Sequence, residues 1–387
     1  MHSTVRPVAL LALAAVVACS DGGTTPSPAR PIQPRSVAEA LAIDLTQVPD
    51  YGHPAWSPDF GADLQAQSNA PLTNPVTSRG ALVGRVLFYD RQLSINGTVS
   101  CATCHQQRHA FTDTLRFSAG FNGGRTAFRS MPLLNVRFYT PGQAFWNRRA
   151  RTVEDQVTQP FQDSVEMGFD AAHGGMPALL ARMDSLGYYG ELFTWLYGDP
   201  QLTEERVRLA LAQFVRSLVS TQSRFDSAWG DVYNLAVPDR GLSHSFPRFT
   251  DEENRGKTLF VVAPGSGGGG CAACHVPPSF ALVGQDVNNG LDAGETRFFK
   301  APSLRSITTS GPYMHDGRFR TLDEVLTHYA SGVQDGPALG YQLRSVTGGT
   351  QRLNLTPADR KALIAFLKTL RDDGIARDPK FGDPFRR

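Results

Sequence analysis

Two short segments decide how this chain is organised: Cys-Ala-Thr-Cys-His at residues 101–105 and Cys-Ala-Ala-Cys-His at residues 271–275. In each segment two thiols stand three positions apart, and an imidazole directly follows the second thiol. On a helical turn such side chains share one face and can meet one porphyrin edge and its iron. This spacing is typical of covalent c-type haem attachment. The sequence therefore predicts two haem c groups attached through Cys101, Cys104, Cys271 and Cys274, with His105 and His275 as iron ligands.

Other uses of paired cysteines fit the sequence less well. A thioredoxin-like redox pair needs a βαβ setting, and no strand pattern precedes either segment. A zinc site needs a second ligand pair at compatible spacing, whereas 170 residues separate Cys101 from Cys271. Two disulfides are the usual use of four cysteines in an exported protein, but the His after each pair favours haem attachment.

The sequences around the two motifs resemble each other, which indicates an internal duplication. Gly-Arg-Val-Leu-Phe (84–88) precedes the first motif, and Gly-Lys-Thr-Leu-Phe (256–260) precedes the second. Each half is also expected to end in an amphipathic helix that follows a capping threonine, over 202–218 and 355–370. We therefore predict a mainly α fold of two cytochrome c-type domains, each holding one covalently bound haem c.

The N-terminal segment predicts export. A basic start is followed by an apolar stretch too short to span a membrane and by Ala18-Cys19, which resembles a bacterial lipobox. We expect a lipoprotein signal over 1–18, lipidation of Cys19, and a periplasmic protein anchored to the outer membrane. Ordinary secretion is the alternative. A tether and N-terminal extension (19–75) and two domains (76–240 and 241–387) would follow.

The composition of the 387 residues excludes several classes of protein. Hydrophobic residues make up 41% and charged residues 19%, which argues against a disordered chain. The net charge is +2 and no basic run stands out, so we expect no nucleic-acid partner and membrane contact only through a lipid anchor. The mean hydropathy of -0.25 argues against a polytopic membrane protein.

Beyond the two motifs, five segments carry a specific resemblance. They are GRVLFYDRQLSINGTVSCATCH (84–105), AFTD (110–113), FW-x-RRA (145–150), VEMG (165–168) and APSLRSITTSGPYMHDGRFRTLDEVLTHY (301–329). Over roughly residues 80–370 the chain is similar to the bacterial dihaem cytochrome c peroxidase and MauG family. The resemblance implies that the N-terminal haem is the peroxide site and that the C-terminal haem transfers electrons.

Two positions depart from the ordinary peroxidases of that family. Where those carry a His that caps the N-terminal iron, this chain has Phe121, which cannot ligate iron. The resemblance therefore implies a five-coordinate haem that is open to peroxide. Where they carry a Met fourteen residues after a His, counting from His315 gives Tyr329, as in the MauG branch. Tyr329 is thus the expected second ligand of haem iron 2, with His328 or Met314 as alternatives.

The resemblance also assigns catalytic roles. Glu166 matches the distal acid–base Glu, which would move a proton between the peroxide oxygens, and Gln156 matches a neighbour that positions peroxide. Trp146 matches the Trp through which electrons pass between the haems. Arg149 is expected to pair with a haem propionate. The family further implies Ca²⁺ between the haems, at positions that correspond to Ser130, Ser310 and Pro312. Ser is a poorer ligand for a hard cation than Asn, so calcium stays open.

Three functions follow. The first is a peroxidase-family enzyme that reduces hydrogen peroxide. Its electrons would come from a small periplasmic cytochrome c or cupredoxin, or from a Trp or Tyr of a protein substrate in MauG-like oxidation. The second is a non-catalytic dihaem electron-transfer cytochrome, which requires two strong axial ligands on each iron and is disfavoured by Phe121. The third, a haem-based sensor or scaffold, leaves Glu166 and Gln156 without a role.

Overall fold

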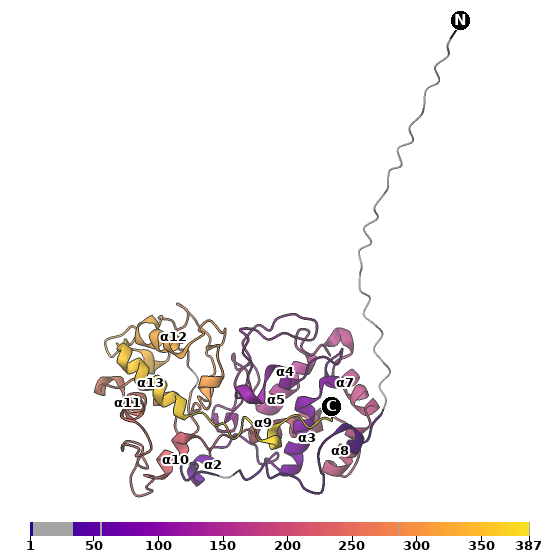
Figure 1. The fold of residues 1–387 in the computed structure, drawn as a ribbon, viewed down its shortest axis with the longest axis horizontal. Coiled ribbons are helices and arrows are strands. Elements are labelled where there is room, and N and C mark those ends of the chain that lie inside the picture. Colours follow the sequence, from indigo (N-terminus) through magenta and orange to yellow (C-terminus); the bar gives the residue numbers. More distant parts are fainter. Residues whose placement is uncertain (3–33, 55, 286, 387) are drawn as a thin grey trace. The chain divides into compact units, whose positions relative to one another are not determined.

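The computed structural model describes residues 1–2, 34–54, 56–285 and 287–386 (Figure 1). The chain divides into two units, Met1–Pro31 and Ile32–Arg387. Almost all of the predicted signal segment, together with Cys19, lies outside the described residues. Both haem motifs belong to the second unit, and everything that follows concerns that unit.

The second unit consists of helices joined by long loops and short 3₁₀ turns (Figure 1). The longer helices are α3 (Ser78–Tyr89), α7 (Gly175–Ser185), α8 (Tyr188–Tyr197), α9 (Glu204–Ser217), α11 (Asp251–Val261) and α13 (Pro357–Thr369). The shorter ones are α1 (Val37–Ala40), α2 (Ala62–Gln65), α4 (Cys101–Cys104), α5 (Val153–Val157), α6 (Gln159–Gln162), α10 (Arg224–Gly230) and α12 (Leu322–Thr327). Within the described ranges, β pairing is limited to isolated bridges, so the predicted mainly helical fold is confirmed.

Two helix pairs, α3 with α9 and α11 with α13, form the most extensive helix contacts. In the first pair Gly84 lies so close to the Ala210 carbonyl that a Cβ would collide with it. In the second pair Gly256 stands in the same relation to the Ala362 carbonyl. Glycine is therefore required at both positions to bring the helix backbones together. The same contact between a glycine of one helix and an alanine carbonyl of its partner helix thus occurs in the helix pair that accompanies each haem motif.

The predicted helix starts and the aromatic packing agree with this arrangement. Helices α9 and α13 begin after Thr203 and Thr356, whose side chains accept hydrogen bonds from backbone N–H groups three residues later. The rings of Phe88 and Phe214 pack 5.1 Å apart between α3 and α9. The rings of Phe260 and Phe366 pack 5.1 Å apart between α11 and α13. These pairs belong to two large and separate hydrophobic clusters.

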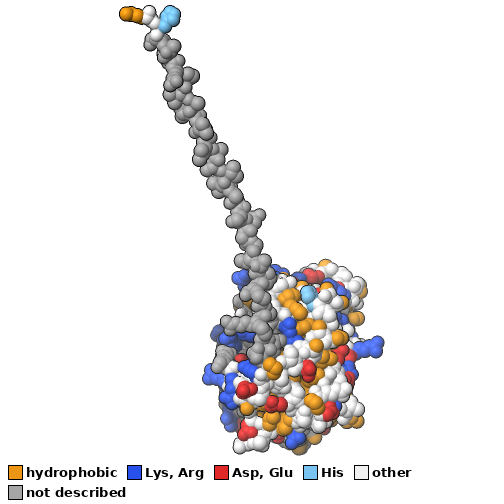
Figure 2. Space-filling model, turned by 90° about the vertical axis from the view of Figure 1, so that its right-hand side faces the viewer, with side chains coloured by type: hydrophobic (Ala, Val, Ile, Leu, Met, Phe, Trp, Pro, Cys, Tyr) orange, Lys and Arg blue, Asp and Glu red, His pale blue; other side chains and the backbone are white. Residues whose placement is uncertain are grey.

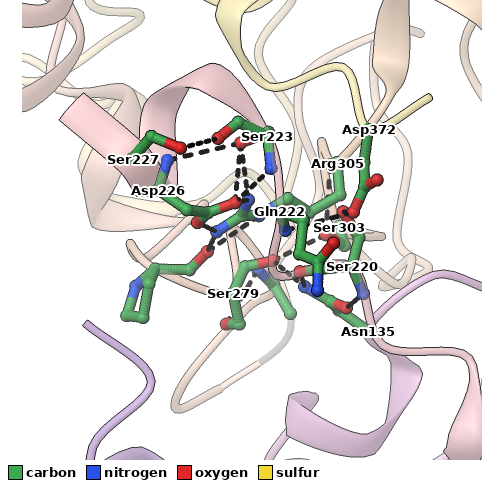
Figure 3. A network of polar contacts seen from close by, with 12 residues as sticks. Asn135, Ser220, Gln222, Ser223, Asp226, Ser227, Ser279, Ser303, Arg305 and Asp372 are labelled. Carbon is green, nitrogen blue, oxygen red and sulfur yellow. Dashed lines mark hydrogen bonds and ion pairs between the residues drawn. The ribbon is translucent and has the colours of Figure 1, made fainter. Parts of the chain in front are cut away.

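A buried polar network connects the segment after α9 to Asn135 on one side and to Arg305 and Asp372 on the other (Figure 3). Arg305 and Asp226 form an ion pair with a distance of 2.6 Å between guanidinium and carboxylate, and both side chains are buried. Ser220 is fully buried. Its N–H donates to the Asn135 side chain and its hydroxyl donates to Asp372, each at 2.8 Å. Polar groups buried without such partners would cost stability, so the network fixes this connection firmly.

The outer surface carries both signs of charge. On the face shown in Figure 2, acidic and basic side chains are interspersed with apolar and uncharged ones. Within the described part of the chain, no helix combines the length and the apolarity needed to cross a bilayer.

Candidate functional site

The first motif forms a short helical turn that presents its imidazole inward. Helix α4 begins after Ser100, and the backbone N–H of His105 donates to the Cys101 carbonyl at 2.8 Å. Nδ1 of His105 lies 2.8 Å from the Phe111 carbonyl, so this nitrogen can donate to it and leave Nε2 for a metal. Burial lowers the pKa of His105, which favours the neutral, ligating form.

The second motif repeats this geometry on a 3₁₀ turn, Cys271–Ala273. The N–H of His275 donates to the Cys271 carbonyl at 2.9 Å, and Nδ1 lies 3.4 Å from the Phe280 carbonyl. Burial lowers the pKa of His275 to about 4, so its imidazole is neutral. None of the four motif cysteines forms a disulfide. Each motif therefore offers two thiols and one neutral imidazole, which is the donor set that haem c requires.

A cavity of about 520 Å³ opens beside the first motif and is lined by Cys101, Cys104 and His105. This volume is within the usual range for cofactor pockets. Apolar side chains form much of its wall, among them Phe88, Val99, Val157, Leu211 and Val215. Four cationic side chains also line it: Arg125, Arg129, Arg149 and Lys300. An apolar wall with cationic groups suits a haem, whose propionates need positive partners, so the residues fit this cofactor.

The two predicted acid–base residues line the same cavity. Gln156 lies on α5, and Glu166 lies on the loop that follows α6. One oxygen of Asp163 accepts the N–H groups of Val165 and Glu166, at 2.8 and 2.9 Å, and so holds this loop in place. Burial and the nearby Asp163 charge raise the pKa of Glu166 to about 7, against a lowering by Arg149. A carboxyl group with this pKa can both accept and donate a proton near neutral pH.

Phe121, at the position of the missing His, does not line the cavity. Its N–H donates to the Glu166 carbonyl at 3.1 Å, and its ring lies against Ile95 and the Cα of Gly168. Gly168 has a φ of +86°, which glycine adopts readily, and a Cβ there would collide with the Phe121 ring. The segment that carries Phe121 therefore supports the Glu166 loop from outside the cavity.

Trp146 connects the cavity wall with residues of the second half of the chain, which contains the second haem motif. It lines the cavity, is 8% exposed, and packs with Met131 and Phe299. Its carbonyl accepts the N–H of Lys300 at 3.0 Å. The ring of His315 lies 6.4 Å from that of Trp146 and stacks on Phe299 at 4.0 Å. A continuous path of aromatic contacts therefore leads from the cavity to the 313–319 segment.

Tyr329 follows α12 in a π-helical turn, His328–Gly332. Burial raises the pKa of its phenol to about 12, against a hydrogen bond from Asn289. The thiols of Cys274 and Cys271 add to this rise. The two alternative ligands, like Tyr329, contact Asn289. Nε2 of His328 is 3.0 Å from the Asn289 carbonyl, and the Met314 sulfur accepts from the Asn289 side chain at 3.4 Å.

The positions predicted for calcium do not form a vacant set of oxygen ligands. The Ser130 hydroxyl donates to the Cys104 carbonyl at 2.5 Å and lies 3.3 Å from Nδ1 of His105. The Ser310 carbonyl accepts a hydrogen bond from the Arg129 guanidinium. Pro312 lies two positions further along the same segment. Ser130 and Ser310 do not fit a calcium site, because the oxygens that would bind the ion already have protein partners.

Several lining residues were not predicted: Arg125, Arg129, Lys300, Met131 and Met167. Met167 lies inside the VEMG segment, and Lys300 directly precedes the 301–329 segment. Both residues could therefore have been found from the family resemblance, because one lies within a segment that carries it and the other lies next to one. No sequence pattern predicted Arg129, because its side chain contacts a residue far away in the chain, Ser310.

The chain is similar to known proteins over most of its length. Residues 78–232 match the family model described as di-haem cytochrome c peroxidase. The methylamine utilization protein MauG of Methylorubrum extorquens is 32% identical, over 79% of this chain and 82% of the relative. The chain belongs to the dihaem cytochrome c peroxidase/MauG family. This family membership makes it an oxidoreductase with haem cofactors.

Relatives from both branches of the dihaem peroxidase/MauG family are similar to this chain. Cytochrome c551 peroxidase of Nitrosomonas europaea is 27% identical, over 77% of this chain and 82% of the relative. Among solved structures, a MauG-like protein associated with microbial copper homeostasis has a TM-score of 0.65 and 27% identity. The match covers 86% of this chain and 98% of that protein. Membership of the family therefore does not distinguish a peroxidase reaction from a MauG-like reaction.

Proposed function

We propose that this protein is a periplasmic dihaem c-type oxidoreductase that reduces hydrogen peroxide beside His105, with electrons relayed through the haem of the second half. The observation that carries the proposal is the cavity that brings together the first haem motif, Glu166 and Gln156. The repeated helix-pair contacts at Gly84 and Gly256 support two haem-binding halves related by duplication. The lipobox-like Cys19 supports export and anchoring to the outer membrane.

Glu166 is the proton carrier of this reaction. When bound, haem iron supplies a site at which the O–O bond of peroxide is cleaved and electrons are taken up. Glu166 accepts a proton from the inner peroxide oxygen and returns it to the outer one, which leaves as water. Gln156 orients the peroxide by hydrogen bonding, and Arg149, which lines the cavity, would pair with a haem propionate. Two electrons and two protons are consumed for each peroxide, and two waters are formed.

Trp146 and Tyr329 take part in the transfer of electrons to the first haem. Trp146 lies between the cavity and the second half, so it is the residue through which electrons reach the first haem. Tyr329 would be the second ligand of haem iron 2. Binding to the iron would release the phenol proton, and the resulting anionic phenolate would favour the oxidised metal. The electron source is a small periplasmic cytochrome c or cupredoxin, or a Trp or Tyr of a protein substrate.

To test this proposal, the holoprotein is mixed with hydrogen peroxide and a reduced small c-type cytochrome, and the oxidation of the cytochrome is measured. We expect two cytochromes to be oxidised for each peroxide consumed. Peroxide consumption with an added protein substrate alone, accompanied by oxidation of its Trp or Tyr, would assign the MauG-like reaction instead. The alternative, a non-catalytic electron-transfer cytochrome, requires that both haems accept and release electrons while peroxide is not consumed.

A further inference from the structure

Arg129 is a buried cation that lies between the two halves of the unit. Only 4% of its surface is exposed. Its guanidinium donates to the backbone carbonyls of Asp113 and Ser130 in the first half and of Ser310 in the second half. Burial lowers its pKa to about 10, while Asp113 and Tyr313 act in the opposite direction. The guanidinium is therefore charged at neutral pH and is held by backbone carbonyl groups.

Backbone carbonyls that converge on one point are also the ligands that a hard divalent cation takes from a protein. Here the Ser310 carbonyl, one of the predicted calcium ligands, is bound by Arg129. The Ser130 hydroxyl, another predicted ligand, is directed to the Cys104 carbonyl and to His105. A divalent cation at this place would have to displace the guanidinium and would lie beside its positive charge. Repulsion between two buried cations opposes this strongly.

We propose that the Arg129 guanidinium is the built-in cation that joins the two haem-binding halves, and that the protein neither binds nor needs calcium there. The same residue fixes the neighbouring aromatic path through its backbone. Its N–H donates to the His315 carbonyl at 2.9 Å, and its carbonyl accepts from Trp146 at 2.7 Å. Arg129 is thus a positioning residue for Trp146. This link between the halves is independent of whether the protein reduces peroxide.

Metal analysis of the full-length holoprotein gives the direct test. The protein is desalted without chelator, its calcium content is measured by mass spectrometry, and its melting temperature and haem spectrum are compared in excess CaCl₂ and in excess EGTA. We expect far less than one calcium per chain, and the same melting temperature and spectrum in both buffers. One calcium per chain, together with a lower melting temperature in EGTA, would overturn the proposal.

A variant and a matched control test the role of the guanidinium itself. Arg129→Gln should lower the melting temperature by ~5 °C, since the buried Asp113 and Ser310 carbonyls lose their donor and the Ser130 carbonyl keeps only the Thr112 hydroxyl. It should also change the fluorescence of Trp146. The control is Arg116→Gln, because Arg116 also donates across the halves, to the Asp316 carbonyl at 2.9 Å, but its side chain is 59% exposed. The control should melt like the wild type.

An unchanged melting temperature and fluorescence in Arg129→Gln would contradict the proposal. If this variant does not accumulate as folded protein, Arg129→Lys takes its place, since lysine keeps the charge but loses the planar fork of donors. We expect Arg129→Lys to fold with a lower melting temperature and to remain insensitive to EGTA. A melting temperature of Arg129→Lys that rises with calcium and falls with EGTA would show that a metal, not the side chain, supplies the charge.

Discussion

The indole N–H of Trp146 donates a hydrogen bond of 2.7 Å to the backbone carbonyl of Arg129. This bond fixes the ring in the wall of the first cavity, where it also packs with Phe299 of the second half. A buried indole N–H without a partner would cost stability, so the bond holds the ring in a single orientation. The aromatic group between the two haem motifs is therefore preorganised by its own backbone surroundings.

Trp146→Phe should slow electron delivery without loss of haem. Phenylalanine fills most of the same space but is much harder to oxidise and cannot donate to the Arg129 carbonyl. We expect oxidation of a reduced cytochrome to fall by about tenfold or more, which corresponds to about 1.4 kcal/mol in the barrier. Trp195→Phe is the control, because Trp195 lies on α8 against Arg79. Equal rates for Trp146→Phe and wild type would remove Trp146 from the path.

Glu166→Gln should abolish most peroxide turnover while both haems stay attached. The amide retains the shape of the side chain but cannot carry a proton, and loss of such a group typically costs about 10²–10⁴-fold in rate. The measurement is steady-state peroxide consumption together with the haem content per chain. Asp170→Asn makes the same chemical change at a nearby position whose carboxylate instead caps His173, and it should leave the rate unchanged. Full activity in Glu166→Gln would exclude Glu166 as the proton carrier.

The rate of peroxide consumption should depend on pH through Glu166. Its carboxylate must be ionised to accept a proton, so the rate should fall as the pH drops below about 7. Asp163 raises this pKa, and Asp163→Asn therefore should shift the acid limb of the profile to lower pH. The asparagine oxygen can still accept the N–H groups of Val165 and Glu166. An acid limb that stays in place or moves to higher pH would contradict the assignment.

Arg305→Met should destabilise the folded protein strongly. The substitution leaves the Asp226 carboxylate buried and without its ion pair, a change that typically costs about 3–5 kcal/mol in the free energy of unfolding. Guanidinium denaturation of the holoprotein measures this. Arg248→Gln breaks the exposed pair with Asp231 and should cost much less, because solvent screens that pair. Similar losses in the two variants would mean that the buried network of Figure 3 does not stabilise the connection between the halves.

Local sequence patterns predicted much of this structure. The helix starts at Thr203 and Thr356 follow from capping residues next to amphipathic segments, which is information contained within a few positions. The placement of Glu166 and Gln156 in one cavity came from resemblance to a family rather than from local pattern.

Contacts between distant parts of the chain could not be predicted in this way. The bond from Arg129 to the Ser310 carbonyl joins residues 181 positions apart, and both partners are common residue types without a local signature. The stacking of Phe299 on His315 likewise depends on how a loop returns to the cavity wall. Such contacts are selected by packing in three dimensions, which a single sequence does not reveal.

The most direct test of the account is a stopped-flow absorbance record of the fully ferric holoprotein mixed with hydrogen peroxide in the absence of reductant. Phe121 lies outside the cavity, and Glu166 lines it, so we predict a rapid decrease and shift of the Soret band. A Soret band that stays unchanged would contradict the account. It would mean that a sixth ligand closes the first haem, for which Met131 and Met167 are the thioether side chains in the cavity wall.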